Sequence, residues 1–114
     1  MKRPFHLAWF LSQGYGPKSW RTEWPGSDIR RWMMPDLFVE LARGMERACF
    51  DYLIIEDSSN VPYTYQGSHD TYLKYAASTP KLDPAVLVPY LAQATEHLGI
   101  VPTLSVSEYP PYLL

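Results

Sequence analysis

Three short runs of apolar residues, each about the length of a β-strand, divide the sequence. They are Phe5 to Leu11, Tyr52 to Ile55 (closed by Glu56 and Asp57), and Ile100 to Val106. The runs are almost free of polar residues, as expected for strands covered by helices; strands with one wet face alternate apolar and polar residues instead. The pattern predicts buried strands over residues 5–11, 52–56 and 100–106.

Two segments with helical periodicity lie between these strands. The first covers residues 35–48, where apolar residues recur at helical spacing and form one stripe beginning with Leu37 and Phe38. Charged residues lie opposite this stripe: Glu40, Arg43, Glu46 and Arg47. Pro35 is well placed for the first turn, because its missing N–H would have no partner there in any case.

The second helical segment covers residues 84–98. Asp83 is a candidate N-cap and Pro84 suits the first helical position, while Gly99 suits the left-handed position that ends many helices. Pro89 lies inside the segment and is expected to bend the helix or loosen its first turns.

The order β-α-β-α-β predicts an α/β fold with parallel strands and right-handed crossovers. The links from helix to strand are tight, whereas the links from strand to helix are long, roughly Ser12 to Met34 and Ser58 to Leu82. Long loops on the carboxyl side of every strand are typical of a TIM (β/α)₈ barrel. The first strand–helix turn has no G-x-G-x-x-G, which argues against a Rossmann unit.

A complete barrel takes ~250 residues, and this chain has 114. Residues 1–114 are therefore expected to form a partial domain, the N-terminal portion of the barrel. Three strands alone would leave two exposed sheet edges, which are prone to association.

Composition narrows the class of protein. Hydrophobic residues make up 46% of the chain, which favours a globular core over disorder. The net charge of −2, with both signs interspersed, gives no support for binding nucleic acid or an anionic membrane. No apolar run approaches the ~18 residues of a membrane span. The single cysteine, Cys49, cannot form an internal disulfide; a buried, inert thiol and a cytoplasmic location are expected.

The last twenty residues carry the most specific motifs. In Thr95 to Leu114 (TEHLGIVPTLSVSEYPPYLL), a T-x-x-L-G run leads into a strand that ends in alternating hydroxyl residues and a Y-P-P-Y turn. This stretch resembles the nitrilotriacetate monooxygenase and dibenzothiophene-sulfone monooxygenase group of the bacterial luciferase-like flavin-dependent monooxygenase superfamily. Upstream, Glu46 to Ser58 (ERACFDYLIIEDS) is similar to its second-strand signature, His6 to Leu11 to its first strand, and Asp83-Pro84 to the opening of its second helix.

The resemblance spans the chain in order and implies a barrel that binds reduced FMN. In that group a separate NAD(P)H:flavin reductase supplies the flavin, and O₂ is the co-substrate that oxygenates a small organic substrate. Two alternatives stay open: an F420-dependent oxidoreductase of the same superfamily, and a non-catalytic α/β module that dimerises through its sheet edges. The E-R-x-x-F-D and Y-P-P-Y motifs favour the monooxygenase over the F420 enzyme.

The resemblance implies three cofactor-binding residues: Asp57 matches a position that contacts FMN, and a threonine or serine position near the flavin is matched best by Ser107 and less well by Ser105. Asp57 closes the second strand, where its carboxylate could accept from flavin hydroxyls or a ring N–H; the alternative is an aspartate that caps its own loop. Ser105 and Ser107 are expected at the end of the third strand and, by period two, on one side of the sheet. Their alternative role is to satisfy backbone groups at the strand end. Glu108 departs from the family pattern.

Other candidate residues have simpler interpretations. Trp20, Trp24 and Trp32 could cover a flavin or an apolar substrate, but apolar plugs that hold down the first loop are the favoured interpretation. His6 is expected to be a satisfied core or rim histidine rather than a base.

The other two histidines suggest no metal site. His69 and Asp70 are adjacent, and no third residue at ligand spacing accompanies them. His97 is expected in the last helical turn, where its charge would suit the helix dipole. No residue in the chain is assigned a catalytic role.

Overall fold

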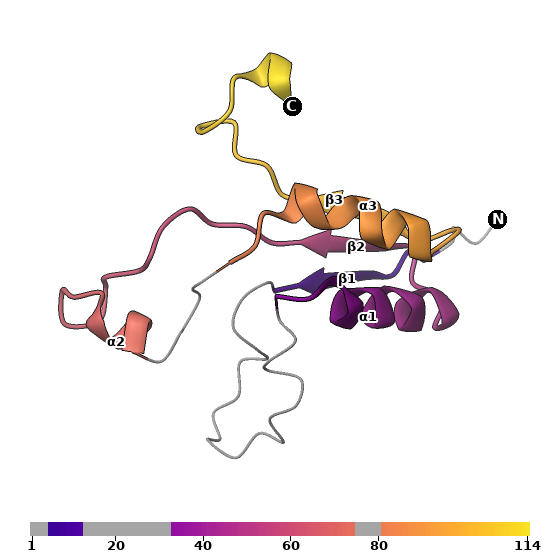
Figure 1. Ribbon diagram of the computed structural model, residues 1–114, viewed down its shortest axis with the longest axis horizontal. Helices are drawn as coiled ribbons and strands as arrows, with labels where there is room; N and C mark the ends of the chain where they lie inside the picture. The colour runs from indigo at the N-terminus through magenta and orange to yellow at the C-terminus, as the bar shows by residue number, and fades with distance from the viewer. Residues whose placement is uncertain (1–4, 13–32, 75–80) are drawn as a thin grey trace.

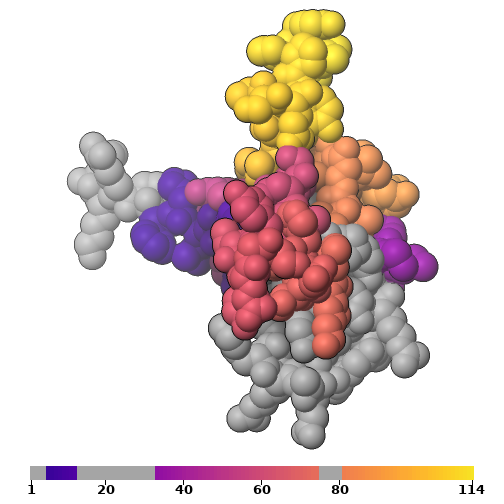
Figure 2. Space-filling model, turned by 90° about the vertical axis from the view of Figure 1, so that its left-hand side faces the viewer, coloured from indigo at the N-terminus to yellow at the C-terminus, as the bar shows by residue number. Residues whose placement is uncertain are grey.

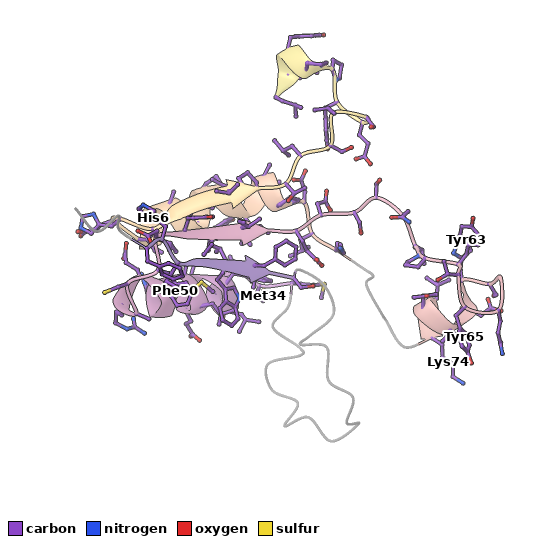
Figure 3. All side chains as sticks on the ribbon, turned by 180° about the vertical axis from the view of Figure 1, so that it is seen from behind. His6, Met34, Phe50, Tyr63, Tyr65 and Lys74 are labelled. Carbon is purple, nitrogen blue, oxygen red and sulfur yellow. The ribbon has the colours of Figure 1, made fainter. Side chains whose placement is uncertain are left out.

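The computed structural model describes residues 5–12, 33–74 and 81–114. Three parallel strands form one sheet in the order β1 (Ala8–Leu11), β2 (Tyr52–Ile55) and β3 (Gly99–Pro102). The helices α1 (Pro35–Arg47) and α3 (Pro84–Ala94) provide the crossovers, and both lie on the same face of the sheet (Figures 1 and 3). The predicted parallel β-α-β-α-β arrangement is confirmed.

The core lies between this face of the sheet and the two helices. Its apolar side chains are less than a tenth exposed: Leu11, Phe38, Ala42, Met45, Leu53, Ile55, Leu87, Leu91 and Leu98. The spacing of the α1 members, at i, i+4 and i+7, is the apolar stripe that the sequence pattern predicts. Leu41 lies four residues after Leu37, at the margin of the same stripe, and is 40% exposed.

None of the helices in the described part of the chain covers the opposite face of the sheet. Register places Phe10, Ile54 and Val101 side by side in one row across the three strands. Phe10 and Val101 are exposed. Alternate residues of a strand point to opposite faces, so this row faces away from the helices, on the side that a closed barrel would enclose.

Helix α1 ends in a tight backbone motif. The N–H of Phe50 donates to the carbonyl of Met45, and the N–H of Cys49 donates to that of Glu46, both at 3.0 Å. This pair of bonds defines a Schellman motif, whose C′ residue takes the left-handed conformation. Cys49 fills that position with φ of 61° and is exposed. The expectation of a buried thiol is therefore wrong, because the helix end needs this residue in the turn and not in the core.

Helix α3 is continuous through Pro89 but stops at Ala94, earlier than the predicted residue 98. Asp83 caps its first turn as expected, its Oδ1 accepting from the N–H of Ala85 at 2.8 Å. At the other end Thr95 is extended, and the following N–H groups bond to a side chain of α1 instead of continuing the helix. His97 therefore lies beyond the helix and not in its last turn.

Strand β3 is shorter than predicted, ending at Pro102 instead of reaching residue 106. Gly99 belongs to this strand and is not a left-handed helix cap. The N–H of Gly99 donates to the carbonyl of Asp51, just before β2, at 2.8 Å, and that of Thr103 to the carbonyl of Ile55 at 3.0 Å. The backbone N–H groups of the even-numbered positions between them therefore point away from β2. Pro102 lies at one of them, where its missing N–H costs no bond to β2.

Strand β1 is likewise shorter than the predicted 5–11 and begins at Ala8. The carbonyl of Leu7 still accepts from the N–H groups of Asp51 and Tyr52. Its N–H donates to a side chain, the Asp51 carboxylate, which ends the regular ladder there.

The segment after β2 contains a short helix that the sequence did not predict, α2 (Asp70–Lys74). It projects away from the sheet together with Tyr63 and Tyr65 (Figure 3). The turn before it is held locally, since His69 Nδ1 lies 3.1 Å from the Pro62 carbonyl and Thr64 Oγ1 lies 2.9 Å from the Tyr72 hydroxyl. A final 3₁₀ turn spans Pro111–Leu113.

Within the described ranges, none of the helices has the length and apolar character to cross a bilayer. Among these same residues, no three His, Cys, Asp or Glu side chains are grouped so that they could hold a metal ion.

Candidate functional site

The carboxyl ends of the strands open into two hollows, the smaller with a mainly polar lining and the larger with a more apolar one. Figure 2 looks onto this end, where the segment after β2 lies in front and the C-terminal residues stand apart from it. The hollows measure about 240 and 410 Å³ and share one wall, residues 57–60. The first is closed by the segment before α3, and the second by residues 103–106 with Glu108. The end of β2 is thus the common element of both hollows.

Asp57, the first residue of this shared wall, is half-buried. Its Oδ1 accepts from the backbone N–H of Ser58 at 2.8 Å. This is the loop-capping bond expected of an aspartate in a turn. It uses one carboxylate oxygen and orders the side chain at the rim of both hollows.

Ser105 and Ser107 lie past the end of β3, so the expectation that they end a strand is wrong. They belong to a turn in which the Ser105 carbonyl accepts from the N–H groups of Glu108 and Tyr109, both at 3.1 Å. Ser105 lines the larger hollow, and its Oγ lies 3.3 Å from the N–H of Ser107. Ser107 is exposed and is not part of either wall. The structure brings Ser105 close to the wall that carries Asp57.

A second polar group at this end was missed in the sequence. Glu56 Oε1 accepts from the Ser12 hydroxyl at 2.5 Å and from the Lys81 ammonium at 3.1 Å. The group joins the ends of β1 and β2 to the segment before α3. The sequence does show an acidic pair, Glu56-Asp57, directly after an apolar strand. The partners described for Glu56, however, are Ser12 and Lys81, which lie 44 and 25 residues away along the chain. No local pattern identifies them.

The lining of the hollows is rich in acceptors. Asp57, Asp83 and Glu108 contribute carboxylates, and the cation among the lining residues, Lys81, is paired with Glu56. Such a site suits the hydroxyl and N–H groups of a ligand and disfavours its phosphate, which like charges repel.

The remaining candidates lie elsewhere. Trp20, Trp24 and Trp32 are outside the described residues. His69 packs edge-on against Tyr63 near α2, with ring centroids 5.8 Å apart. His6 is at the amino rim, as expected, where Nδ1 lies 3.2 Å from Asp51 Oδ1. It is far along the strands from the hollows.

The amino ends of the strands are held by two carboxylates. Glu46 Oε1 accepts from three successive backbone N–H groups, those of residues 96, 97 and 98, at 2.8, 2.6 and 3.1 Å. The bond from His97 in particular lowers the pKa of Glu46. Asp51 Oδ2 accepts from the N–H of Leu7 at 2.7 Å, and this bond, with the His6 side chain, lowers the pKa of Asp51. Glu46 and Asp51 are the first and last residues of the E-R-x-x-F-D motif. Both have a structural role at the amino ends of the strands.

Comparison with known proteins gives relatives of a single type. No family model matches the chain. Dibenzothiophene-sulfone monooxygenase of Rhodococcus erythropolis (strain XP) is 33% identical over 97% of this chain and 25% of its own length. Dimethyl-sulfide monooxygenase of Hyphomicrobium sulfonivorans is 34% identical over 84% of this chain and 20% of its own length.

Solved structures agree with the sequence relatives. The crystal structure of DmoA from Hyphomicrobium sulfonivorans superposes with a TM-score of 0.84 at 31% identity, over 97% of this chain and 24% of that one. The long-chain alkane monooxygenase LadA gives a TM-score of 0.79 at 28% identity, over 91% of this chain and 24% of that one. Both are TIM-barrel monooxygenases, so the predicted fold class is confirmed: an N-terminal β-α-β-α-β portion of such a barrel.

The chain spans about a quarter of the length of the curated relatives it matches. In sequence and in fold the chain is similar to these monooxygenases, and this similarity is consistent with the luciferase-like group of flavin-dependent monooxygenases.

Proposed function

We propose that this chain supplies the first strands and part of the flavin-binding end of a two-component, FMN-dependent monooxygenase. Reduced flavin, when bound, supplies the electrons with which O₂ oxygenates the substrate. A separate NAD(P)H:flavin reductase delivers it. The name of one relative, nitrilotriacetate monooxygenase component A, supports a system of more than one component.

The observation that carries the proposal is the acceptor-rich wall at the carboxyl end of β2. TIM barrels bind their ligands at this end, and Asp57 lines both hollows there. In the proposal the carboxylate of Asp57 accepts hydrogen bonds from flavin hydroxyls or a ring N–H. Ser105 donates from the facing wall, and Ser107 contacts the flavin only if its turn folds inward on binding.

The acidic lining also limits what these residues hold. The phosphate of FMN binds elsewhere in the proposal, because phosphate in such barrels commonly binds at the last strands. The 114-residue chain by itself therefore binds FMN weakly, and measurable oxygenation requires the protein in its full native length.

The substrate is a small organic molecule. Relatives are named for a sulfone, a sulfide, an alkane and an amino-polycarboxylate, so the group accepts varied chemistry. All of them are named as monooxygenases, which favours this function over an F420-dependent oxidoreductase and over a module that only dimerises.

The test is titration of FMN, followed by flavin fluorescence, with the protein in its full native length. Asp57→Asn keeps the size of the side chain but removes its charge, and we expect a dissociation constant raised about tenfold, as for the loss of a charged hydrogen bond. Asp70→Asn, on the projecting α2, is the matched control and leaves the constant unchanged.

The outcomes separate the parts of the proposal. Absence of FMN binding by the full-length protein contradicts the function itself. An unchanged constant for Asp57→Asn contradicts only the contact. Sub-micromolar binding of FMN by residues 1–114 alone contradicts the assignment of the phosphate to later strands.

A further inference from the structure

A largely buried ion pair lies beside the proposed flavin wall. The side chains of Lys81 and Glu56 are 11% and 18% exposed, and their charged atoms, Nζ and Oε1, are 3.1 Å apart. The Ser12 hydroxyl donates to the same oxygen of Glu56. One carboxylate oxygen thus joins three segments that the sequence separates.

The placement of Glu56 follows from the register of the sheet. Rows of the uncovered face contain Ala8, Tyr52 and Gly99, and then Phe10, Ile54 and Val101. Continued by two residues, the next row contains Ser12, Glu56 and Thr103. The ladder extends this far, since Glu56 N–H donates to Leu11 and Thr103 N–H to Ile55, each at 3.0 Å. The row is polar and stands where the sheet meets the hollows.

The shared wall begins at the next residue. Asp57 follows Glu56 directly, and Lys81 lines the smaller hollow opposite residues 57–60. The bond shown for Asp57 itself is local, to Ser58. Among the described residues, the bonds of Glu56 to Ser12 and Lys81 tie the start of this wall to β1 and to the segment before α3.

We infer that Glu56 is a positioning residue for the flavin: by holding Lys81 and Ser12, it fixes the wall that begins at Asp57. The inference rests on the proposed function. It assigns Glu56 no contact with the flavin or the substrate.

A charged partner is needed because Lys81 is too buried to be solvated freely. Removing one member of a buried pair leaves the other charge uncompensated, and the structure then relaxes to bring that charge to water. For Lys81 this relaxation moves the segment that closes the smaller hollow. Replacing Glu56 and Lys81 together leaves no unpaired buried charge to drive this relaxation. It also removes the ion pair that holds the wall in place.

The experiment measures the dissociation constant of FMN, together with the kcat and KM for reduced flavin, in the protein in its full native length. Glu56→Gln is expected to raise the dissociation constant and KM about tenfold while kcat at saturating flavin falls less than about twofold. Glu56→Asp, which keeps the charge, restores part of the affinity. The matched control is Glu96→Gln, the same chemical change at an exposed residue near the amino ends of the strands. It leaves all three constants unchanged.

A second variant keeps the inference falsifiable if Glu56→Gln does not fold. Glu56→Gln with Lys81→Met leaves no unpaired buried charge, and it is expected to fold and to bind FMN as weakly as the single variant.

The inference is overturned if either folded variant binds FMN as the unmodified protein does. It is also overturned if kcat falls as much as affinity, which indicates a catalytic role or general loss of structure. If the unmodified full-length protein binds no FMN, the proposed function has failed, and the inference that rests on it is overturned as well.

Discussion

The two ends of the sheet use the same kinds of side chain for opposite purposes. At the amino end, Glu46 and Asp51 accept hydrogen bonds from backbone N–H groups of distant segments, and their role is structural. At the carboxyl end, the bond described for Asp57 is to its neighbour's N–H, and among the described residues the space beside it is open. Of these three carboxylates, the two at the amino end are structural, and Asp57 at the carboxyl end borders open space.

Connection length explains the difference. The helix-to-strand links are too short for all of their backbone N–H groups to form bonds within a turn of their own. Side-chain carboxylates accept others, and Glu46 accepts three of them. Strand-to-helix links are long, and their polar groups bond locally or to one another, as around His69 and Tyr72. The amino end closes the fold, while the carboxyl end is left for binding.

The largest expected effect is at Glu46. Glu46→Ala leaves the three N–H groups of residues 96–98 without their acceptor, and we expect a fall in Tm of several degrees, the largest in this series. Asp57→Asn, at the open end, is expected to leave Tm almost unchanged. Equal losses of Tm in the two variants would contradict the division between the ends.

The same carboxylate predicts a pH dependence. The pKa of Glu46 is lowered in the folded protein, so its contribution to stability is present at neutral pH and is lost as the pH falls below about 4 and through the lower folded pKa. The difference in Tm between the unmodified protein and Glu46→Ala should therefore shrink on acidification. Thermal unfolding followed by circular dichroism between neutral pH and pH ~3 measures it.

Gly99 tests how closely the amino end is packed. A Cβ added there would lie 3.0 Å from the Cβ of Tyr52 and 3.3 Å from the Asp51 carbonyl oxygen. Gly99→Ala is expected to destabilise the fold by about 1 kcal/mol, at the low end for overpacking, measured by urea unfolding.

Gly44 is the matched control for that substitution. In the middle of α1, its added Cβ would meet only the Arg47 side chain at 3.8 Å. Gly44→Ala should stabilise the fold by up to about 1 kcal/mol, since alanine is the better helix former. Two changes of the same sign would show that the close approach at Gly99 does not decide its effect.

The smallest effect concerns the helix end before β2. Cys49 has φ of 61°, which a glycine adopts without steric cost. Cys49→Gly is expected to raise stability by about 0.5–1 kcal/mol, and Cys49→Ala, which keeps the Cβ, to leave it unchanged. A loss of stability in Cys49→Gly would mean that the thiol makes a contact whose stabilisation exceeds the cost of the left-handed backbone conformation at Cys49.

The sequence by itself determined the elements that local pattern and chain direction dictate. The apolar runs identified the three strands, the periodicity of residues 35–48 identified α1, and Asp83-Pro84 identified the start of α3. The order of these elements gave a parallel sheet with its long loops at one end. Each of these depends on residues close together in the chain or on the handedness of the crossover.

Only the tertiary structure decided where elements stop and which polar residues meet. Helix α3 ends at Ala94 because Glu46, fifty residues earlier, takes the N–H groups that would have continued it. The strand predicted to reach Val106 ends at Pro102, so Ser105 and Ser107 lie in a turn and only Ser105 lines a hollow. Glu56, Ser12 and Lys81 come together for the same reason: hydrogen bonds between distant segments depend on the packing of the sheet, and no spacing along the chain records them.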